Sequence, residues 1–514
     1  MPAAAKSQSS DSVPLSVWLG FAMMCVGMFM AVLDIQVVAT SLPTIQNALH
    51  IQPDQMSWIQ TGYLIAEIIA IPLTGLLVRV LTMRWLFVSA TVIFTLASIA
   101  CALSGSFSDL IAFRVIQGFA GGTLIPTVFS AVFILFPVRL QAPATTLAGI
   151  VAVLAPTVGP IVGGWITETY SWPWLFLINV APGVVAAGVA ALALPKAHVQ
   201  FLLLRQMDVV ALMLGAVALA ALEIAIKEGP ERGWTSPLAA GLLVLTTICA
   251  AAFIARTRRS ASPLVDLTAF RDRNFTIGCV LSFALGIGLF GSVYLMPVFL
   301  AFVRGHNALE IGEVMLVTGV AQLAIAPVAV LMVQRFDLRL LTAFGFVLFG
   351  IGLALSAWQM KDTDFAAMFW PQVLRGCAVM FCILPPTQLA LGHLPKTAVA
   401  DASGLFNLMR NLGGAIGIAV IDTIIFGRAP EIANSLVSRL MNGNLETAAA
   451  MGLRPDDLGP ALLDPAKQAL LAPLIKQLAY VHAINEAWAV VAVATLLVLV
   501  IIPFARETNA RIVR

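Results

Sequence analysis

The sequence predicts an all-α polytopic membrane protein. Of its 514 residues, 60% are hydrophobic and only 11% are charged, and the mean hydropathy is +0.96. A water-soluble protein needs a more polar surface than this composition supplies, so the bilayer must solvate most of the chain. The apolar stretches are long enough for helices that cross the hydrocarbon core, which need about 20 residues. Strands of a membrane barrel are about 10 residues long and alternate in polarity, so a barrel is excluded.

Apolar stretches of spanning length occur about fourteen times along the chain. They cover 17–41, 57–78, 84–104, 109–135, 143–167, 174–194, 207–227, 236–256, 274–303, 310–333, 338–358, 366–392, 399–427 and 483–504. We predict that they form an N-terminal six-helix bundle, two linker transmembrane helices and a C-terminal six-helix bundle, at 17–195, 196–258 and 259–505. Tails at 1–16 and 506–514 and an exterior loop at 428–482 complete the chain.

Weak internal repetition supports two related bundles. The run Phe113-Arg114-Val115-Ile116-Gln117-Gly118 in the fourth span has a counterpart in Pro371-Gln372-Val373-Leu374-Arg375-Gly376 in the twelfth. Arginines after the second span also have counterparts after the tenth. Many secondary transporters are built from two such bundles, with a site between them at the middle of the membrane. Chance similarity of apolar segments would be the better explanation if only one pair existed.

The distribution of positive charge predicts the orientation. Most of the 29 lysines and arginines fall in the two tails and in alternate turns. Short loops rich in these residues stay on the cytoplasmic side. Both termini are therefore predicted to be cytoplasmic, and the loop at 428–482 is predicted to face the periplasm or exterior.

Several functions are excluded by composition and motifs. The 29 basic residues nearly cancel the 26 acidic ones, so nucleic acid is not an expected partner. All six cysteines sit inside apolar runs, which predicts neither disulfides nor a metal site. No nucleotide-binding loop, nucleophile elbow or metal cluster is present. We expect no enzymatic activity and no cofactor, and the proton gradient would supply the energy.

Charged residues inside the spans carry the functional prediction, because each one costs a few kcal/mol unless it faces a wet cavity or a partner. Asp34 lies in the first span, Glu67 in the second and Arg114 in the fourth. Asp34 and Glu67 lie about seven and ten residues from the outer ends of antiparallel helices, so they can share one depth. Neighbouring carboxylates in a low-dielectric cavity raise each other's proton affinity, and a permanently charged Arg114 can tune it. We predict that these three residues couple transport to protons; the alternative for Asp34 is a structural salt bridge.

Other polar groups in the spans are predicted to line the substrate cavity. These are Gln36, Gln60, Tyr63, Gln117, Gln372, Arg375, Asn407 and Arg410. For Arg375 and Arg410, helix pairing is an equally good explanation. Glu223 and Asp422 are predicted to be structural or to lie at the lipid interface.

The fifth span combines residues that bend helices with residues that let helices approach closely. It reads Ala155-Pro156-Thr157-Val158-Gly159-Pro160-Ile161-Val162-Gly163-Gly164. Prolines remove helical hydrogen bonds and glycines remove side chains. We predict gating and packing roles for Gly118, Pro156, Gly159, Pro160, Gly163 and Gly164.

These motifs together resemble a known family. Arg114-x-x-Gln117-Gly118 and Gly159-Pro160-x-x-Gly163-Gly164 look like two motifs of the drug:proton antiporters of the major facilitator superfamily. Leu33-Asp34 followed by Leu42-Pro43 resembles the first-helix motif of the fourteen-helix branch. The runs Leu264-Val265-Asp266-Leu267 and Arg273-Asn274-Phe275-Thr276-Ile277-Gly278-Cys279, and Asn407-Leu408-Met409-Arg410 with Gly413 and Gly417, resemble the EmrB-like subgroup. The resemblance covers about residues 17 to 505.

The resemblance implies a major facilitator fold and multidrug efflux from the bacterial inner membrane. Asp34 and Arg114 would take part in proton coupling. A periplasmic membrane-fusion adaptor and an outer-membrane channel would be partners, reached through the exterior loop. The chain departs from the wider pattern at Arg79, where aspartate is usual, and at Thr82, where glycine is usual, which puts a charge-relay latch in that loop in doubt.

We therefore predict a proton-coupled antiporter that exports hydrophobic or amphipathic small molecules. One alternative is an exporter of a narrow solute such as an organic acid or siderophore, whose charge Arg375 or Arg410 would neutralise. Another is a membrane receptor that transports nothing. Asp464-Pro465 before the run 466–481 is a helix start signal, so we also predict that the last helix begins outside the membrane or follows a short amphipathic helix.

Overall fold

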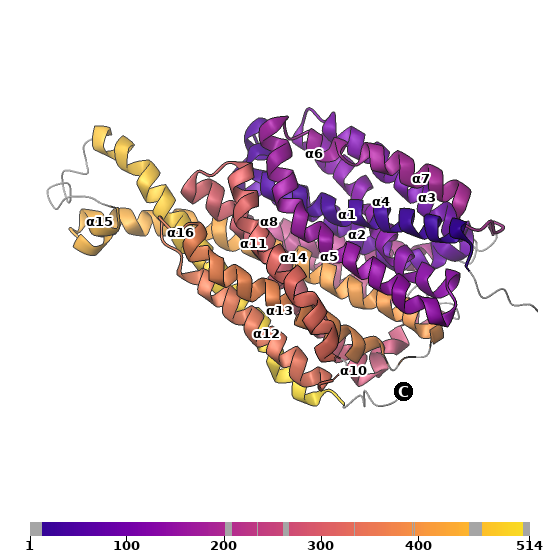
Figure 1. Cartoon of the computed structure of the whole chain (residues 1–514). Coiled ribbons are helices and arrows are strands. Elements are labelled where there is room, and N and C mark those ends of the chain that lie inside the picture. The colour runs from indigo at the N-terminus through magenta and orange to yellow at the C-terminus, as the bar shows by residue number, and fades with distance from the viewer. Residues whose placement is uncertain are drawn as a thin grey trace, which may run out of the picture.

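The computed structural model describes residues 13–200, 208–233, 235–260, 267–333, 335–392, 394, 396–451 and 465–506, and every regular element within them is helical (Figure 1). Twelve helical segments there are long and apolar enough to cross a membrane. One of them, Trp58–Ala102, covers two predicted spans, and the separate 32-residue helix Val138–Thr169 covers another. The predicted all-helical fold class is confirmed, and the number of membrane crossings stays a prediction.

The first half of the chain forms one bundle. Its helices are α1 (Leu15–Ala48), α2 (Trp58–Ala70), α3 (Thr74–Ala102), α4 (Phe107–Leu135), α5 (Val138–Thr169), α6 (Trp174–Leu177) and α7 (Val180–Ala193). Within this N-terminal bundle, α1 packs against α5 and α7, while α4 packs against α2 and α3.

The second half forms another bundle after a pair of peripheral helices. The peripheral pair is α8 (Val209–Arg232) and α9 (Pro237–Arg259). The bundle contains α10 (Arg273–Phe299), α11 (Ala308–Val333), α12 (Leu338–Leu355), α13 (Phe365–Leu391), α14 (Lys396–Met441), α15 (Leu445–Met451) and α16 (Pro465–Leu497). A 3-10 segment, η9 (Val498–Phe504), extends α16. Only 11% of the most apolar window of α9 is buried. An apolar helix with so little protein around it needs lipid as its neighbour.

Several helix starts follow local sequence signals. A serine or aspartate side chain accepts a hydrogen bond from the first turn of α4, α8, α9, α10, α12 and α13, namely Ser106, Asp208, Ser236, Asp272, Asp337 and Asp364. Such N-caps satisfy backbone N–H groups that have no partner within the helix. Asp337 also accepts from the Arg339 side chain, and this bond, opposed by burial, lowers the pKa of Asp337 below its usual 3.8.

Two helices extend far beyond the bundle at one end of the molecule (Figure 1). Helix α14 has 46 residues, which corresponds to about 70 Å against a hydrocarbon core of about 30 Å. Its projecting part packs against α16 through a separate apolar cluster that includes Leu436, Leu440 and Leu471. We call this end the extension face and the opposite end, where α1 begins and η9 ends, the termini face.

The extension corrects one prediction and confirms another. The predicted exterior loop at 428–482 contains the last third of α14, the short helix α15 and the first part of α16, so most of its described residues are helical. The predicted thirteenth span, 399–427, ends too early, because α14 continues to Met441 and its apolar residues beyond 427 pack against α16. The last helix does begin well before the apolar stretch at 483–504, at Pro465, as predicted.

The turn between the second and third spans contains a strained residue. α2 continues through a 3-10 turn, Ile71–Leu73 (η2), into α3, whose helical path breaks at Thr82 with φ +71° and ψ +157°. A β-branched residue rarely adopts positive φ, because its Cβ crowds the backbone. The Thr82 hydroxyl is also buried without a hydrogen-bond partner. The glycine that the family pattern expects here would avoid both problems.

We therefore expect Thr82→Gly to raise the free energy of unfolding by about 1–2 kcal/mol, because glycine adopts positive φ without steric strain. Urea unfolding of the purified protein in detergent would measure it. The control is Thr91→Gly, because Thr91 lies in the regular part of α3 and donates a hydrogen bond to Phe87 at 2.8 Å. That change should destabilise the protein. A Thr82→Gly protein no more stable than the unmodified chain would contradict the strain argument.

Candidate functional site

Asp34 is the centre of a buried polar network in the N-terminal bundle. Its side chain, on α1, has no exposed surface. One carboxylate oxygen forms an ion pair with Arg114 of α4. The other accepts hydrogen bonds from Gln117 Nε2 and from Asn179 Nδ2, both at 2.9 Å. Donors from α4 and from the start of α7 therefore fix the position of this carboxylate.

Arg114 joins four elements of the same bundle. Its Nε donates to the Ile59 carbonyl at 3.1 Å, and its Nη1 donates to Gln117 Oε1 at 2.8 Å as well as to Asp34. The guanidinium carbon lies 4.4 Å from the centre of the Tyr63 ring and 5.8 Å from that of Phe176. Because the charge is fully buried, its pairing with Asp34 must offset a large desolvation penalty. Loss of one partner alone would leave the other charge buried and unpaired.

The structure brings together predicted residues from both categories. Asp34 and Arg114, predicted for proton coupling, contact Tyr63 and Gln117, which were predicted to line the cavity. The geometry of Asp34 in this state is that of a buried salt bridge, and its role as a proton carrier stays a prediction.

Sequence reasoning missed two members of this network. Asn179 donates to Asp34, and Ser98 accepts a hydrogen bond from Gln117 Nε2 at 2.8 Å. Asn179 is the only amide side chain in the predicted span 174–194, which was a usable signal. Serine occurs commonly in apolar helices, so Ser98 offered none.

Glu67 lies at the interface between the bundles. It is on α2, one helical turn from Tyr63, and only 2% of its surface is exposed. Asn411, on α14 of the other bundle, is a polar neighbour of this carboxyl group, and α2 packs against α14. Its Oε2 has no hydrogen-bond partner among the described residues. A buried carboxyl group between the two bundles is in a position to respond when they move apart.

Glycines of α4 bring α2 close to this network. A Cβ atom at Gly118 would overlap the Tyr63 carbonyl oxygen, and one at Gly122 would lie 2.7 Å from the Glu67 carbonyl oxygen. The two helices therefore touch backbone to backbone, as small residues permit. The packing role predicted for Gly118 has this physical basis.

The glycines of α5 face two different neighbours. A Cβ at Gly159 would overlap the Gln36 side chain, and one at Gly163 would lie 2.6 Å from the Val37 carbonyl oxygen, so both pack against α1. Gly164 instead packs against the Ala308 backbone of α11, in the other bundle.

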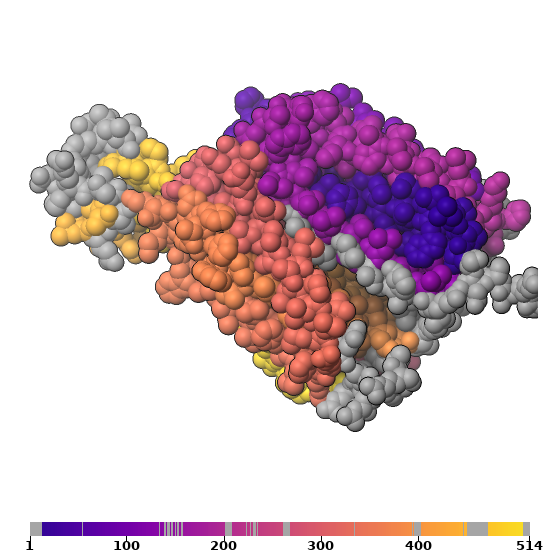
Figure 2. Space-filling model, viewed as in Figure 1, coloured from indigo at the N-terminus to yellow at the C-terminus, as the bar shows by residue number. Residues whose placement is uncertain are grey.

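A second glycine contact makes the α5–α11 crossing reciprocal. Gly312 of α11 packs against the Pro160 carbonyl group of α5, just as Gly164 packs against Ala308. The backbone N–H of Ala308 also donates to Glu168 Oε1 at 3.1 Å. These contacts join the bundles at the extension face, and Figure 2 shows the two halves touching beside the extension and separating toward the termini face. The side chains of Pro156 and Glu223 lie outside the described residues.

The predicted cavity residues of the C-terminal bundle do not join the Asp34 network. Arg375, on α13, is buried with its guanidinium carbon 4.8 Å from the centre of the Trp488 ring. The Gln372 side chain accepts from Thr318 at 3.0 Å. On α14, Arg410 lies 5.7 Å from the Phe406 ring, and Asn407 donates within its own helix. In the N-terminal bundle, Gln36 is buried beside Gly159, and Gln60 is buried with neither amide atom hydrogen bonded.

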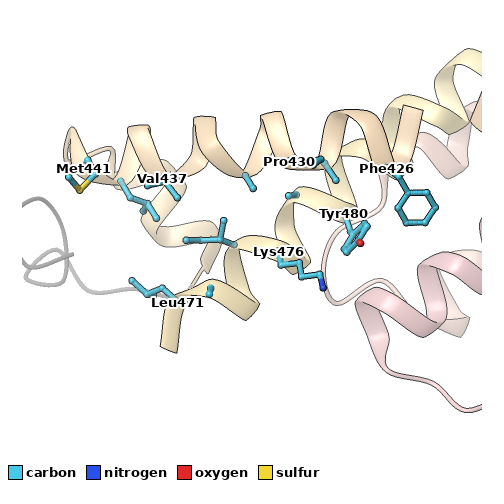
Figure 3. Close-up of a pocket in the computed structure, with 13 residues that line it drawn as sticks. Phe426, Pro430, Val437, Met441, Leu471, Lys476 and Tyr480 are labelled. Carbon is cyan, nitrogen blue, oxygen red and sulfur yellow. The ribbon is translucent and has the colours of Figure 1, made fainter. Parts of the chain in front are cut away.

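A cavity of about 540 Å³ lies elsewhere, between the projecting parts of α14 and α16 (Figure 3). Its lining is apolar except for Lys476 and Tyr480. None of the predicted site residues lines it. Within the described part of the chain, no three His, Cys, Asp or Glu side chains gather as metal ligands would.

Comparison with known proteins agrees with this architecture. Residues 24–418 match the Major Facilitator Superfamily. The chain is 39% identical over 411 residues to the colistin resistance protein EmrB of Acinetobacter baumannii, covering 79% of this chain and 80% of that protein. It is 33% identical over 433 residues to the multidrug export protein EmrB of Escherichia coli K12, covering 84% of each. It is also 31% identical over 399 residues to the fatty acid resistance protein FarB of Neisseria gonorrhoeae, covering 77% and 78%.

Solved structures share the fold at low sequence identity. A D-xylose-proton symporter superposes with a TM-score of 0.61 at 13% identity, covering 97% of this chain and all of that one. An inward-facing bacterial homologue of the human lysosomal transporter Spinster gives 0.60 at 14% identity, with the same coverage. The matched residues, the two bundles and the EmrB relatives all indicate that this chain belongs to the Major Facilitator Superfamily, as an EmrB-like transporter.

Proposed function

We propose that this protein is a proton-coupled antiporter that exports hydrophobic or amphipathic small molecules across the bacterial inner membrane. Its relatives are named for multidrug export, for colistin resistance and for fatty acid resistance. The shared property of such compounds is a large apolar part. A proton gradient would drive the exchange, without a cofactor.

The observation that carries the proposal is the buried pair of Asp34 and Arg114. Protonation of Asp34 would remove the charge that balances Arg114, and the guanidinium group would then need another partner or contact with water. Because α1, α2 and α4 all contact this pair, the change would alter how these helices pack. A single proton could in this way bias which face of the protein opens.

Glu67 would extend the proton pathway to the interface between the bundles. Arg114 covers the Tyr63 ring, and Tyr63 is one turn of α2 away from Glu67. In the proposed cycle, a compound entering from the cytoplasm or the inner leaflet favours loss of the proton, and protons from outside reset the carrier. Comparing proton-driven efflux by the Asp34→Asn and Glu67→Gln variants would show which of the two carboxyl groups carries the proton.

The test is Asp34→Asn, which keeps the shape of the side chain but removes its titration. We expect efflux driven by a pH gradient in inverted vesicles to fall at least a hundredfold, while binding of a transported dye to the purified protein persists. Asp109→Asn is the matched control, because Asp109 is an exposed acid in the first turn of α4. Full gradient-driven efflux by the Asp34 variant would refute the proposed coupling.

Arg375 and Arg410 support a second candidate, the export of a narrow anionic solute such as an organic acid. Among the described residues, the contacts of both guanidinium groups are with aromatic rings and not with carboxylates. An anionic substrate could supply the missing charge. Rates for cationic dyes and for organic acids, measured in the same vesicles, would separate this candidate from multidrug export.

We further propose that both termini are cytoplasmic and that the extension faces the periplasm. A helical projection with an apolar cavity is suited to contact a periplasmic membrane-fusion adaptor, which would connect the transporter to an outer-membrane channel. The relatives named EmrB support this tripartite arrangement.

A further inference from the structure

A second buried carboxylate connects the two bundles at the extension face. Asp422, on α14, is only 4% exposed. It accepts a hydrogen bond from Ser57 Oγ at 2.6 Å and one from the Tyr294 hydroxyl at 2.8 Å. Of the two alternatives predicted for Asp422, the lipid interface is wrong, because neighbouring helices cover the side chain, and the contacts fit the structural one.

The two donors come from different bundles. Tyr294 is on α10, in the same bundle as Asp422, whereas Ser57 immediately precedes α2 in the N-terminal bundle. All three side chains are buried. If the bundles rock as rigid bodies, the bond from Tyr294 to Asp422 can persist, but the bond from Ser57 must break when the extension face opens.

The Ser57–Asp422 bond complements the glycine contacts already described. Helix pairs α5–α11 and α2–α14 are two of those that join the bundles. The first is closed by Gly164 and Gly312, which act through shape alone. The second is closed by a hydrogen bond of 2.6 Å from the Ser57 hydroxyl to the Asp422 carboxyl group.

We propose that Ser57 and Asp422 form a latch that holds the extension face closed and sets the fraction of molecules open on that face. The inference rests on the proposed transport cycle, because a latch is meaningful only in a carrier that alternates between two open states. It assigns Asp422 a positioning role that is separate from the Asp34 network.

The test measures opening directly through an added thiol. Ala308 is 2% exposed and lies in the α5–α11 contact. In an Ala308→Cys protein, the rate of reaction with a water-soluble maleimide reports how often the extension face opens. The same chain without this substitution gives the background from the six native cysteines, five of which are buried.

We expect Ser57→Ala and Asp422→Asn each to speed the labelling by about tenfold, because each removes or weakens a buried hydrogen bond between the bundles. The matched control is Tyr294→Phe, which removes a bond to the same carboxylate within one bundle and should change the rate far less. Ser57→Thr keeps the hydroxyl and should restore slow labelling. Adding Ser57→Ala to Asp422→Asn should raise the rate by less than the product of the two single effects, since both changes weaken the Ser57–Asp422 bond.

The latch is refuted if Ser57→Ala labels at the unmodified rate, or if Tyr294→Phe speeds labelling as much as Ser57→Ala. Loss of folding would instead appear as rapid labelling of all native cysteines. The measurement needs neither a proton gradient nor a substrate. Failure of the Asp34→Asn efflux test would therefore refute the proposed coupling without affecting this result, and the reverse also holds.

Discussion

Replacing Arg114 with methionine is expected to lower the free energy of unfolding by about 3–5 kcal/mol, because it leaves the Asp34 carboxylate buried without its countercharge. Neither side chain has any exposed surface, so solvent cannot replace the lost partner. Urea unfolding of the purified protein in detergent, with efflux assayed on the same preparation, would measure the change. Efflux should be lost together with stability.

Two further variants separate the charge effect from lost packing. The double substitution Arg114→Met with Asp34→Asn removes both charges, so it should recover a large part of the lost stability without recovering gradient-driven efflux. Arg375→Met removes another buried arginine, whose described contact is the Trp488 ring. It should lower the free energy of unfolding by less, because it leaves no carboxylate buried without a countercharge. Equal losses for the Arg114 and Arg375 single variants would show that the ion pair is not the source of the effect.

Replacing Gly164 with alanine is expected to prevent full closure of the extension face. The new Cβ would overlap the Ala308 carbonyl oxygen, a backbone atom that cannot turn aside as a flexible side chain can. Overpacking of this kind disfavours the packed state by roughly 1–3 kcal/mol, which corresponds to about a 5- to 150-fold shift toward the open state. The initial rate of efflux from vesicles should fall by a similar factor, because the carrier accumulates in one state.

The control lies in the same helix. Gly149→Ala adds the same methyl group to α5, but no atom of the described residues lies within 4 Å of the new Cβ, so efflux should be nearly unchanged. Gly312→Ala should reproduce the loss, because Gly312 forms the reciprocal contact with Pro160. If Gly164→Ala and Gly149→Ala transport equally well, the α5–α11 contact does not limit closure.

The long helices and several of their boundaries were predictable from local pattern. A run of about 20 apolar residues has few alternatives to a spanning helix, and Asp272 or Ser106 at the start of a run caps it through a contact only three residues away. The end of α14 was not predictable in the same way. Its projecting part is stabilised by contacts with α16, which no window of the sequence contains.

For the functional residues too, the sequence indicated which residues matter, but not which residues they contact. Asp34, Arg114 and Gln117 were identifiable because polar and charged groups are expensive in a membrane span. Their pairing was not, because Asp34 and Arg114 are 80 residues apart. Gly164 was expected to pack closely, but its neighbour in the other bundle was unknown until α11 was placed beside α5.

By itself, the sequence determined that this chain is a helical membrane protein. It also determined which buried groups would need partners. Those properties follow from composition and from spacing along one helix. Only the tertiary structure decided which partners they have: Arg114 for Asp34, and Ser57, 365 residues away, for Asp422. The physical reason is that a residue's burial cost is a local property, whereas the group that offsets it belongs to whichever helix packs alongside.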